Sequence, residues 1–227
     1  EKEIIKHFGH FKNPTKEIPR PSIISIAERK DNVGMVLTDK EQTINLLQIF
    51  NYVEKAKTIN TWNDYRQSIV EGLFNTLINE RLTELSQLAD PPFLFGNTSF
   101  SNFIRGYRTF VSFAVTGDKP VKDAIDSLLV TTESVQNFGF LTSELERAKS
   151  SLLNEVRTEY DDRNKTESGR IVQEYINNFL QASPLIGIVN RYDFIKQVLP
   201  TITLEEVNAV AKKMDSQQGK FALLLSP

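Results

Sequence analysis

The two histidines of the chain, His7 and His10, are its first candidates for chemistry. They form a His-x-x-His arrangement, a pattern that can bring two imidazoles together at a metal ion. A catalytic zinc ion takes three protein ligands, and no carboxylate lies at ligand spacing near this pair. Gly9, between them, weakens a helix. We therefore interpret both histidines as parts of an exposed helix end, and expect no metal site in this chain.

An acidic run late in the chain is the second candidate. Its members are Glu155, Glu159, Asp161 and Asp162. Neighbouring carboxylates suit a cation site or an acid–base pair. Basic residues are interleaved with them: Arg157, Arg163 and Lys165. We favour a solvated helix face with ion pairs along it.

Covalent and phosphate chemistry find no support in the sequence. Cysteine is absent, which excludes disulfides, thiolate zinc sites and a cysteine nucleophile. No Gly-x-Ser-x-Gly segment and no glycine-rich phosphate loop occur. A serine or threonine nucleophile needs an adjacent base, and both histidines lie near one end. An unrelated α+β enzyme that works through its carboxylates stays as a minor alternative.

Arg81 is the one candidate for contact with a substrate. It lies near the end of a predicted helix, just before Asp90-Pro91-Pro92, where it could reach a substrate carbonyl across a cleft. The alternative pairs it with Glu80, Glu84 or the carboxyl end of the helix. We favour the local partners and keep the substrate-binding role as a second hypothesis.

Charge and hydropathy exclude two classes of partner. The chain has 27 Lys and Arg residues against 29 Asp and Glu residues, interspersed along its length. Binding to nucleic acid requires a basic face, so we expect no nucleic-acid partner. No apolar run approaches the ~20 residues of a membrane-spanning helix.

The elements that position these residues follow from hydrophobic periodicity. Apolar residues at every third or fourth position predict a long helix over 61–86, with Thr61 and Asp64 as a capping box. Short apolar or alternating runs predict strands at 22–29, 33–38, 42–53, 93–104, 107–116 and 221–225. Arg105-Gly106 indicates a tight hairpin.

The remaining segments favour further helices. They begin near Pro120 and at a Ser143–Glu146 capping box, and they cover 171–180, 185–198 and 204–214, the last with a Thr203–Glu206 box. Strands and helices therefore come in separate groups. This order predicts an α+β fold: a mostly antiparallel sheet with helices packed on one face. Three prolines between Asn13 and Pro21 indicate a linker, which follows a short helical segment at the start of the chain.

Four stretches resemble one protein family. They read IIKHFGHFKNPTKEIPRP, LFNTLINERLTELSQLADPPF, ELERAKSSLLNEVRTEYDDRNKTES and LPTITLEEVNAVAKKM. In order and spacing they resemble the pitrilysin/insulinase (inverzincin) group of zinc metallopeptidases, in particular its large bacterial zinc proteases. The resemblance covers essentially the whole chain and implies the domain fold of the mitochondrial processing peptidase.

The resemblance also implies which domain this is. In the family a first domain carries His-x-x-Glu-His, whose histidines bind zinc together with a downstream glutamate. No such motif occurs here, so the chain resembles the second, non-catalytic domain of the amino-terminal half. Residues 1–21 then correspond to the last helix and linker of the missing catalytic domain, and 22–227 to the non-catalytic domain. No zinc ligand carries over to this chain. Zinc is expected only in the first domain of the longer polypeptide to which the chain would belong, called the parent below.

The family uses an arginine and a tyrosine to hold substrate. Arg81 lies on a helix that resembles the one bearing that arginine, but Leu88 occupies the tyrosine position. This broken pair argues against a clamping role for Arg81.

The implied function is architectural. The parent would hydrolyse peptides as a zinc metalloendopeptidase in the bacterial periplasm or cell envelope, and this fragment alone would have no activity. It would form part of the chamber wall and support the catalytic domain, with the parent's other domains and its peptide substrates as partners. The isolated fragment would expose an apolar face and self-associate. The alternative is an inactive scaffold related to processing-peptidase partners or respiratory-complex core proteins.

Overall fold

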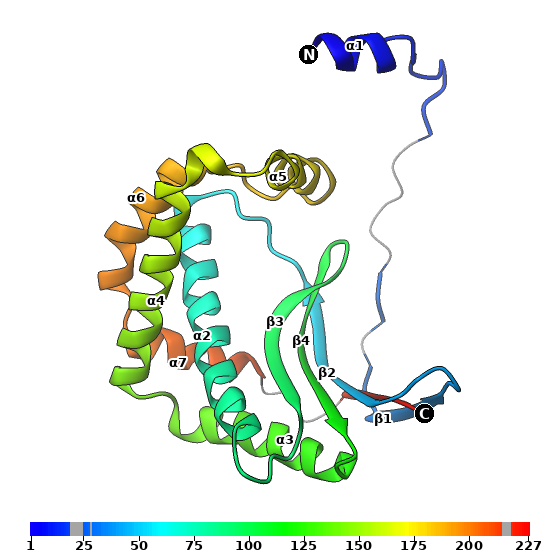
Figure 1. Cartoon of the computed structure of the whole chain (residues 1–227), viewed down its shortest axis with the longest axis vertical. Helices are drawn as coiled ribbons and strands as arrows, with labels where there is room; N and C mark the ends of the chain where they lie inside the picture. The colour runs from blue at the N-terminus through cyan, green and yellow to red at the C-terminus, as the bar shows by residue number, and fades with distance from the viewer. Residues whose placement is uncertain (19–24, 28, 215–218) are drawn as a thin grey trace.

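The computed structural model describes residues 1–18, 25–27, 29–214 and 219–227. Its strands and longer helices are coloured along the chain in Figure 1. The strands are β1 (Val33–Thr38), β2 (Asn45–Lys55), β3 (Phe95–Ile104), β4 (Tyr107–Gly117) and β5 (Phe221–Ser226). The helices are α1 (Lys2–Phe8), α2 (Trp62–Ser86), α3 (Val121–Phe138), α4 (Thr142–Asp161), α5 (Ser168–Gln181), α6 (Ile188–Val198) and α7 (Leu204–Ala211).

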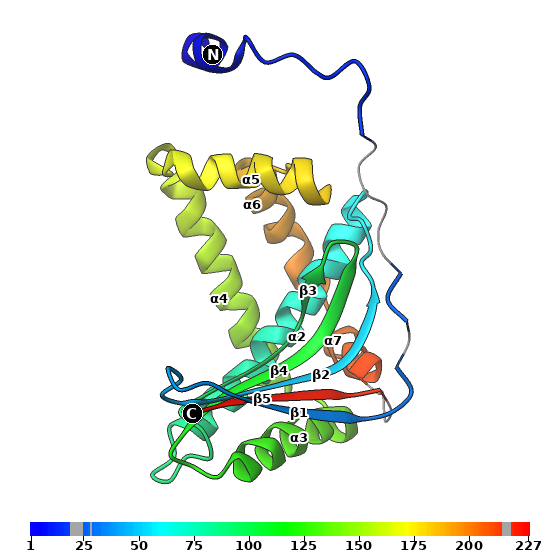
Figure 2. The ribbon, with the colours of Figure 1, turned by 90° about the vertical axis from the view of Figure 1, so that its right-hand side faces the viewer.

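The described strands form one sheet in the order β1-β5-β2-β4-β3. All neighbours are antiparallel except β1 and β5, which run parallel. The strands β2, β3 and β4 curve strongly away from the flatter β1–β5 end (Figure 2). Gly106 adopts a φ of +80° between β3 and β4, so a residue without a Cβ completes the tight turn that the sequence predicts there.

The core lies between the sheet and α2. This helix carries an apolar stripe on the side that faces the strands, as its periodicity predicts. Its buried members are Ile69, Val70, Leu73, Phe74, Leu77, Ile78 and Leu82. Phe74 is fully buried and packs edge-on against Phe100 of β3 and Phe140. One aromatic side chain thus joins the sheet to the loop between α3 and α4.

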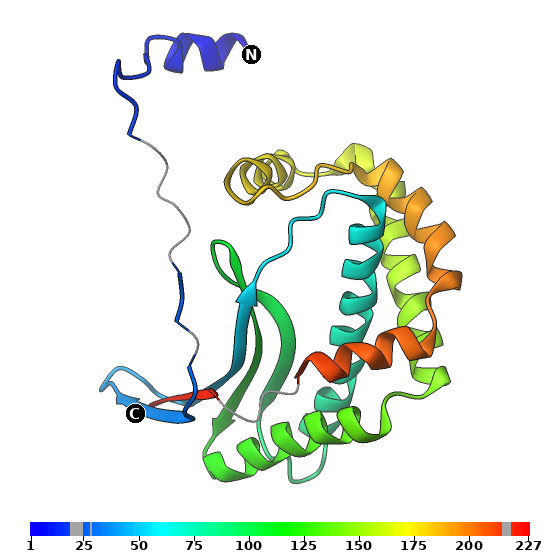
Figure 3. The ribbon, with the colours of Figure 1, turned by 180° about the vertical axis from the view of Figure 1, so that it is seen from behind.

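The helices α3 to α7 complete the helical layer on this face. A second core group places Ala124 and Leu128 of α3 near Leu47 and Ile49 of β2. The helices α4, α6 and α7 pack around α2, while α5 crosses the far end of the layer (Figure 3). The opposite face of the sheet carries rings that are only partly buried, among them Phe113. The α+β class with helices on one face is therefore confirmed.

Two predicted details differ from the structure. The helix α4 begins one residue before the predicted cap: Leu141 is its N-cap, and the Leu141 amide donates to Glu144 Oε2 at 2.6 Å. The Ser143–Glu146 capping box is thus wrong, because Glu146 instead pairs with Lys149 at 3.0 Å. Residues 25–27 and 29 form no strand, and the rest of the predicted 22–29 strand lies outside the described residues. Among the described residues, no helix is long and apolar enough to span a membrane.

Candidate functional site

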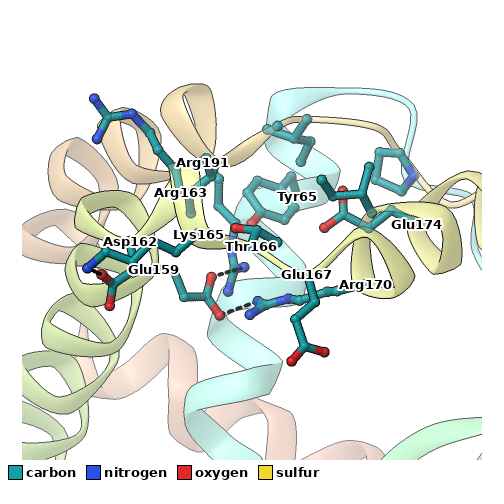
Figure 4. A pocket seen from close by; sticks show the side chains of 15 residues that line it. Tyr65, Glu159, Asp162, Arg163, Lys165, Thr166, Glu167, Arg170, Glu174 and Arg191 are labelled. Carbon is teal, nitrogen blue, oxygen red and sulfur yellow. Dashed lines mark hydrogen bonds and ion pairs between the residues drawn. The ribbon is translucent and has the colours of Figure 1, made fainter.

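The acidic run borders a hollow of about 710 Å³ at the junction of α2, α4, α5 and α6. Figure 4 shows the side chains that line it, with Glu159 between Arg170 and Arg191. Glu159 lines the hollow, with one carboxylate oxygen 2.5 Å from Arg170 Nη2 and the other 2.7 Å from Arg191 Nη1. The side chain of Glu159 is 19 % exposed. Three helices are thus tied together through one carboxylate.

This geometry leaves little capacity for acid–base chemistry. Both oxygens of Glu159 accept charge-assisted hydrogen bonds, and the bond that Arg170 donates to Glu159 raises the pKa of the Arg170 guanidinium. Asp162 pairs with Lys165 at 2.8 Å, and Asp161 lies 3.8 Å from Arg157. These pairs agree with the interpretation of the run as an ion-paired helix face.

Tyr65 of α2 closes one side of the hollow. Burial raises the pKa of its phenol, and the neighbouring Arg191 opposes that shift. A phenol with a raised pKa stays protonated at neutral pH and is available only as a hydrogen-bond donor or acceptor. Its ring packs against that of Phe194 in α6, with the ring centres 5.6 Å apart, and its hydroxyl lies beside Arg191.

The two histidines lie far from the hollow, on and just after α1 (Figure 1). His7 Nε2 is 3.3 Å from Glu3 Oε2, and the His10 ring lies 4.2 Å from the ring of Phe11. Both side chains are exposed. Across residues 1–18, 25–27, 29–214 and 219–227, no three His, Cys, Asp or Glu residues gather as a metal site would require.

Arg81 is held by a partner far away in the sequence. Its guanidinium makes two hydrogen bonds to Glu144, both 2.9 Å long, and a third of 3.1 Å to the carbonyl of Gly139. It also lies 4.9 Å from the ring centre of Phe140. The Arg81 hydrogen bonds, with a smaller contribution from the Leu141 amide, lower the pKa of Glu144.

These contacts join α2 to the start of α4. Leu88, the residue at the family's tyrosine position, is exposed beyond the end of α2. The partner of Arg81 in this ion pair is Glu144, and not Glu80 or Glu84 as predicted from the sequence. A substrate-binding role for Arg81 stays a prediction.

Sequence reasoning missed two asparagines of α2. Asn75 and Asn79 bind the backbone of β3, as described below. The signal in the sequence was their spacing of four beside the apolar stripe of α2, because partly buried amides there need hydrogen-bond partners. Their partners lie on another element, and periodicity alone does not identify them.

No protein-family model matches the chain. A curated relative from Arabidopsis thaliana, named "Zinc protease PQQL-like", is 23 % identical over 225 residues, which cover 99 % of this chain and 20 % of the relative. A second, "Probable zinc protease PqqL" from Escherichia coli, is 20 % identical over 187 residues, 82 % of this chain and 20 % of its own length. The resemblance to insulinase-type zinc proteases is confirmed.

Solved structures of insulinase-type proteins share the fold. The first half of the periplasmic protease PqqL from Escherichia coli has a TM-score of 0.83 and 16 % identity, over 98 % of this chain and 47 % of that one. A peptidase M16 inactive domain from Pseudomonas fluorescens has a TM-score of 0.63 and 15 % identity, over 92 % and 46 %. The chain thus spans about a fifth of its curated relatives and about half of these two solved chains.

Proposed function

We propose that this chain is a non-catalytic domain of an insulinase-type zinc metallopeptidase, and that it forms part of the chamber wall and supports the catalytic domain. Two facts support this. Its curated relatives are named zinc proteases and are about five times as long. The sequence itself contains no His-x-x-Glu-His motif. Zinc would then be held by another domain of the parent.

The observation that carries the supporting role is the exposed apolar face of α5. None of its residues is buried, although apolar side chains make up one whole side of the helix. Five of them line a shallow depression: Val172, Tyr175, Ile176, Phe179 and Leu180. Phe179 is 73 % exposed and Tyr175 is 61 % exposed. Fully burying one large apolar side chain contributes roughly 1.5–3 kcal/mol, so covering this face favours association strongly.

The same reasoning applies to α1. Ile4, Ile5, Phe8 and Phe11 are all more than half exposed. We propose that residues 1–21 belong to the preceding catalytic domain and that the domain proper begins at residue 22. The parent's remaining domains would cover α1 and the α5 face together, and the isolated chain would self-associate through both.

A wall domain acts on catalysis indirectly. A closed chamber restricts which peptides enter and keeps bulk water from the reacting centre. The test uses the parent protein with Ile176→Asp and Phe179→Asp combined. We expect kcat/KM for a peptide substrate to fall by about tenfold or more, equivalent to at least ~1.4 kcal/mol of lost transition-state stabilisation.

Gln173→Asp is the control, because it also adds a negative charge to an exposed position of α5 but leaves every apolar side chain in place. Its kcat/KM should stay within about twofold of the parent's, as for most surface substitutions. An unchanged kcat/KM in the apolar-face variant, with the protein folded, would contradict the proposal.

An inactive scaffold is the second candidate. A chain in the solved structure of complex III2 from Candida albicans has a similar fold, with a TM-score of 0.64 and 13 % identity over 96 % of this chain and 50 % of that one. The discriminating observation is the parent's own sequence: an intact His-x-x-Glu-His supports the peptidase, and a decayed motif supports the scaffold.

A further inference from the structure

The free edge of β3 is covered by side-chain amides. β3 pairs with β4 on one side only, so it is an edge strand of the sheet. On its other side, the Thr98 amide donates to Asn79 Oδ1 at 2.8 Å, and Asn79 Nδ2 donates to the Thr98 carbonyl at 2.9 Å. The Phe100 amide donates to Asn75 Oδ1 at 3.0 Å, and Asn75 Nδ2 donates to the Phe100 carbonyl at 3.1 Å.

Each asparagine therefore takes the place of one residue of a pairing strand. A peptide group and a carboxamide both offer an N–H donor and a C=O acceptor, and here both are used against the same residue of β3. Asn79 Nδ2 also donates to the backbone carbonyl of Asn75 at 2.7 Å, which links the two asparagines. The four outward backbone groups of Thr98 and Phe100 are all occupied.

The geometry explains why the two asparagines lie four positions apart. Four residues of an α-helix rise by about 6 Å, and two residues of an antiparallel strand rise by about 6.8 Å. Helix positions i and i+4 thus match strand positions j and j−2 when helix and strand run in opposite directions. Asn75 pairs with Phe100 in this way, and Asn79, four positions later in the helix, pairs with Thr98, two positions earlier in the strand.

An uncovered sheet edge is a site where an extended polypeptide adds as a further strand. At the opposite edge of the sheet, β1 has the sequence VGMVLT and exposes all six residues. At β3, by contrast, α2 supplies the side chains that cover the edge. In a domain that meets peptides, as the proposed function requires, an open β3 edge would compete for them.

We propose that Asn75 and Asn79 hold shut a strand-addition site on β3, so that this domain takes no extended peptide at that edge. The site is latent: removing the two amides frees four backbone groups in the spacing that an added strand needs, and the added strand then takes the place of α2 beside β3. Its ligand class is an extended polypeptide segment with no requirement for charge.

The first test is residue-resolved amide exchange of the 227-residue chain. Asn79→Ala should speed exchange at Thr98 by about tenfold or more and leave Phe100 within about twofold, and Asn75→Ala should do the reverse. Asn154→Ala is the control: it makes the same replacement at an exposed position of α4 and should change neither amide. Equal effects of both variants at both amides, or none, would overturn the proposal.

The second test adds a probe peptide with the sequence of residues 107–117, which already pairs with β3 from its other side. We expect it to slow exchange at Thr98 and Phe100 in the double variant and to leave these amides unchanged in the wild type. If the double variant does not fold, the wild type alone still decides: peptide-dependent protection of Thr98 and Phe100 would refute a closed edge. Neither test depends on peptidase activity. If the β3 edge is closed but the parent hydrolyses no peptides, only the proposed function is contradicted.

Discussion

Arg81→Ala should destabilise the fold far more than it affects peptide hydrolysis by the parent. The side chains of Arg81 and Glu144 are only 24 % and 14 % exposed. The substitution removes two hydrogen bonds to the carboxylate, one to Gly139 and the contact with the Phe140 ring. It also leaves Glu144 with its charge and, of these partners, only the Leu141 amide.

The magnitude follows from these contacts. A hydrogen bond to a charged group contributes about 1.5–3 kcal/mol, and breaking a buried ion pair costs about 3–5 kcal/mol. Partial exposure lets water solvate the stranded carboxylate, which reduces the loss. We therefore expect the free energy of unfolding to fall by about 2–3 kcal/mol.

Urea unfolding of the 227-residue chain measures this loss through a lower midpoint at an unchanged slope. Arg105→Ala, at the exposed tip of the β3–β4 hairpin, is the control and should stay within about 0.5 kcal/mol of wild type. A double-mutant cycle with Glu144→Ala should give a coupling energy of about 1 kcal/mol or more.

Two results would refute the reasoning. A loss below about 0.5 kcal/mol would mean that the ion pair contributes nothing measurable. In the parent, Arg81→Ala should change kcat/KM by less than about tenfold. A much larger drop in a folded variant would show that Arg81 contacts substrate.

Three further predictions concern metal, pH and capping. The isolated chain should not retain stoichiometric zinc after dialysis, as metal analysis will show, and one tightly held zinc per chain would contradict this. Because the Arg81 hydrogen bonds lower the folded-state pKa of Glu144 below its ordinary value of 4.5, the pair stabilises fully above that value and loses its effect as pH falls through the folded-state pKa. The free energy of unfolding should therefore fall less steeply with decreasing pH in Arg81→Ala than in wild type. An equal pH dependence in both proteins would contradict this prediction. Thr203→Ala, which removes the 3.3 Å bond from the Glu206 amide, should cost about 1 kcal/mol by urea unfolding, and no change would mean that this cap is inert.

Local signals in the sequence predicted most of the fold. Thr61 and Asp64 form the predicted capping box because its partners are three residues apart. The strand at 33–38 and the Arg105-Gly106 turn likewise depend on neighbouring residues. The predicted cap of α4 was wrong because Ser143–Glu146 has the spacing of a capping box, whereas the N-cap in the structure is Leu141, which has no capping side chain. Glu144 accepts hydrogen bonds from both the Leu141 amide and Arg81, and the second contact is tertiary.

The non-local contacts could not be predicted in the same way. Arg81 and Glu144 are 63 residues apart, and nearer glutamates offered equally good partners on a helix surface. The pairing of Asn75 and Asn79 with β3 depends on the register between a helix and a strand, which periodicity does not fix. For α5, the apolar repeat predicted the helix, but the same repeat fits a buried face and an uncovered one.

The central claim is that the rest of a longer polypeptide covers the apolar side of α5. The chain has no cysteine, so Phe179→Cys introduces one reporter at a position that is now exposed. Its rate of maleimide labelling should be fast in the isolated chain, kept dilute enough to be monomeric, and about a hundredfold slower in the parent, since each tenfold corresponds to about 1.4 kcal/mol of opening free energy. Equal labelling rates in both proteins would contradict the claim.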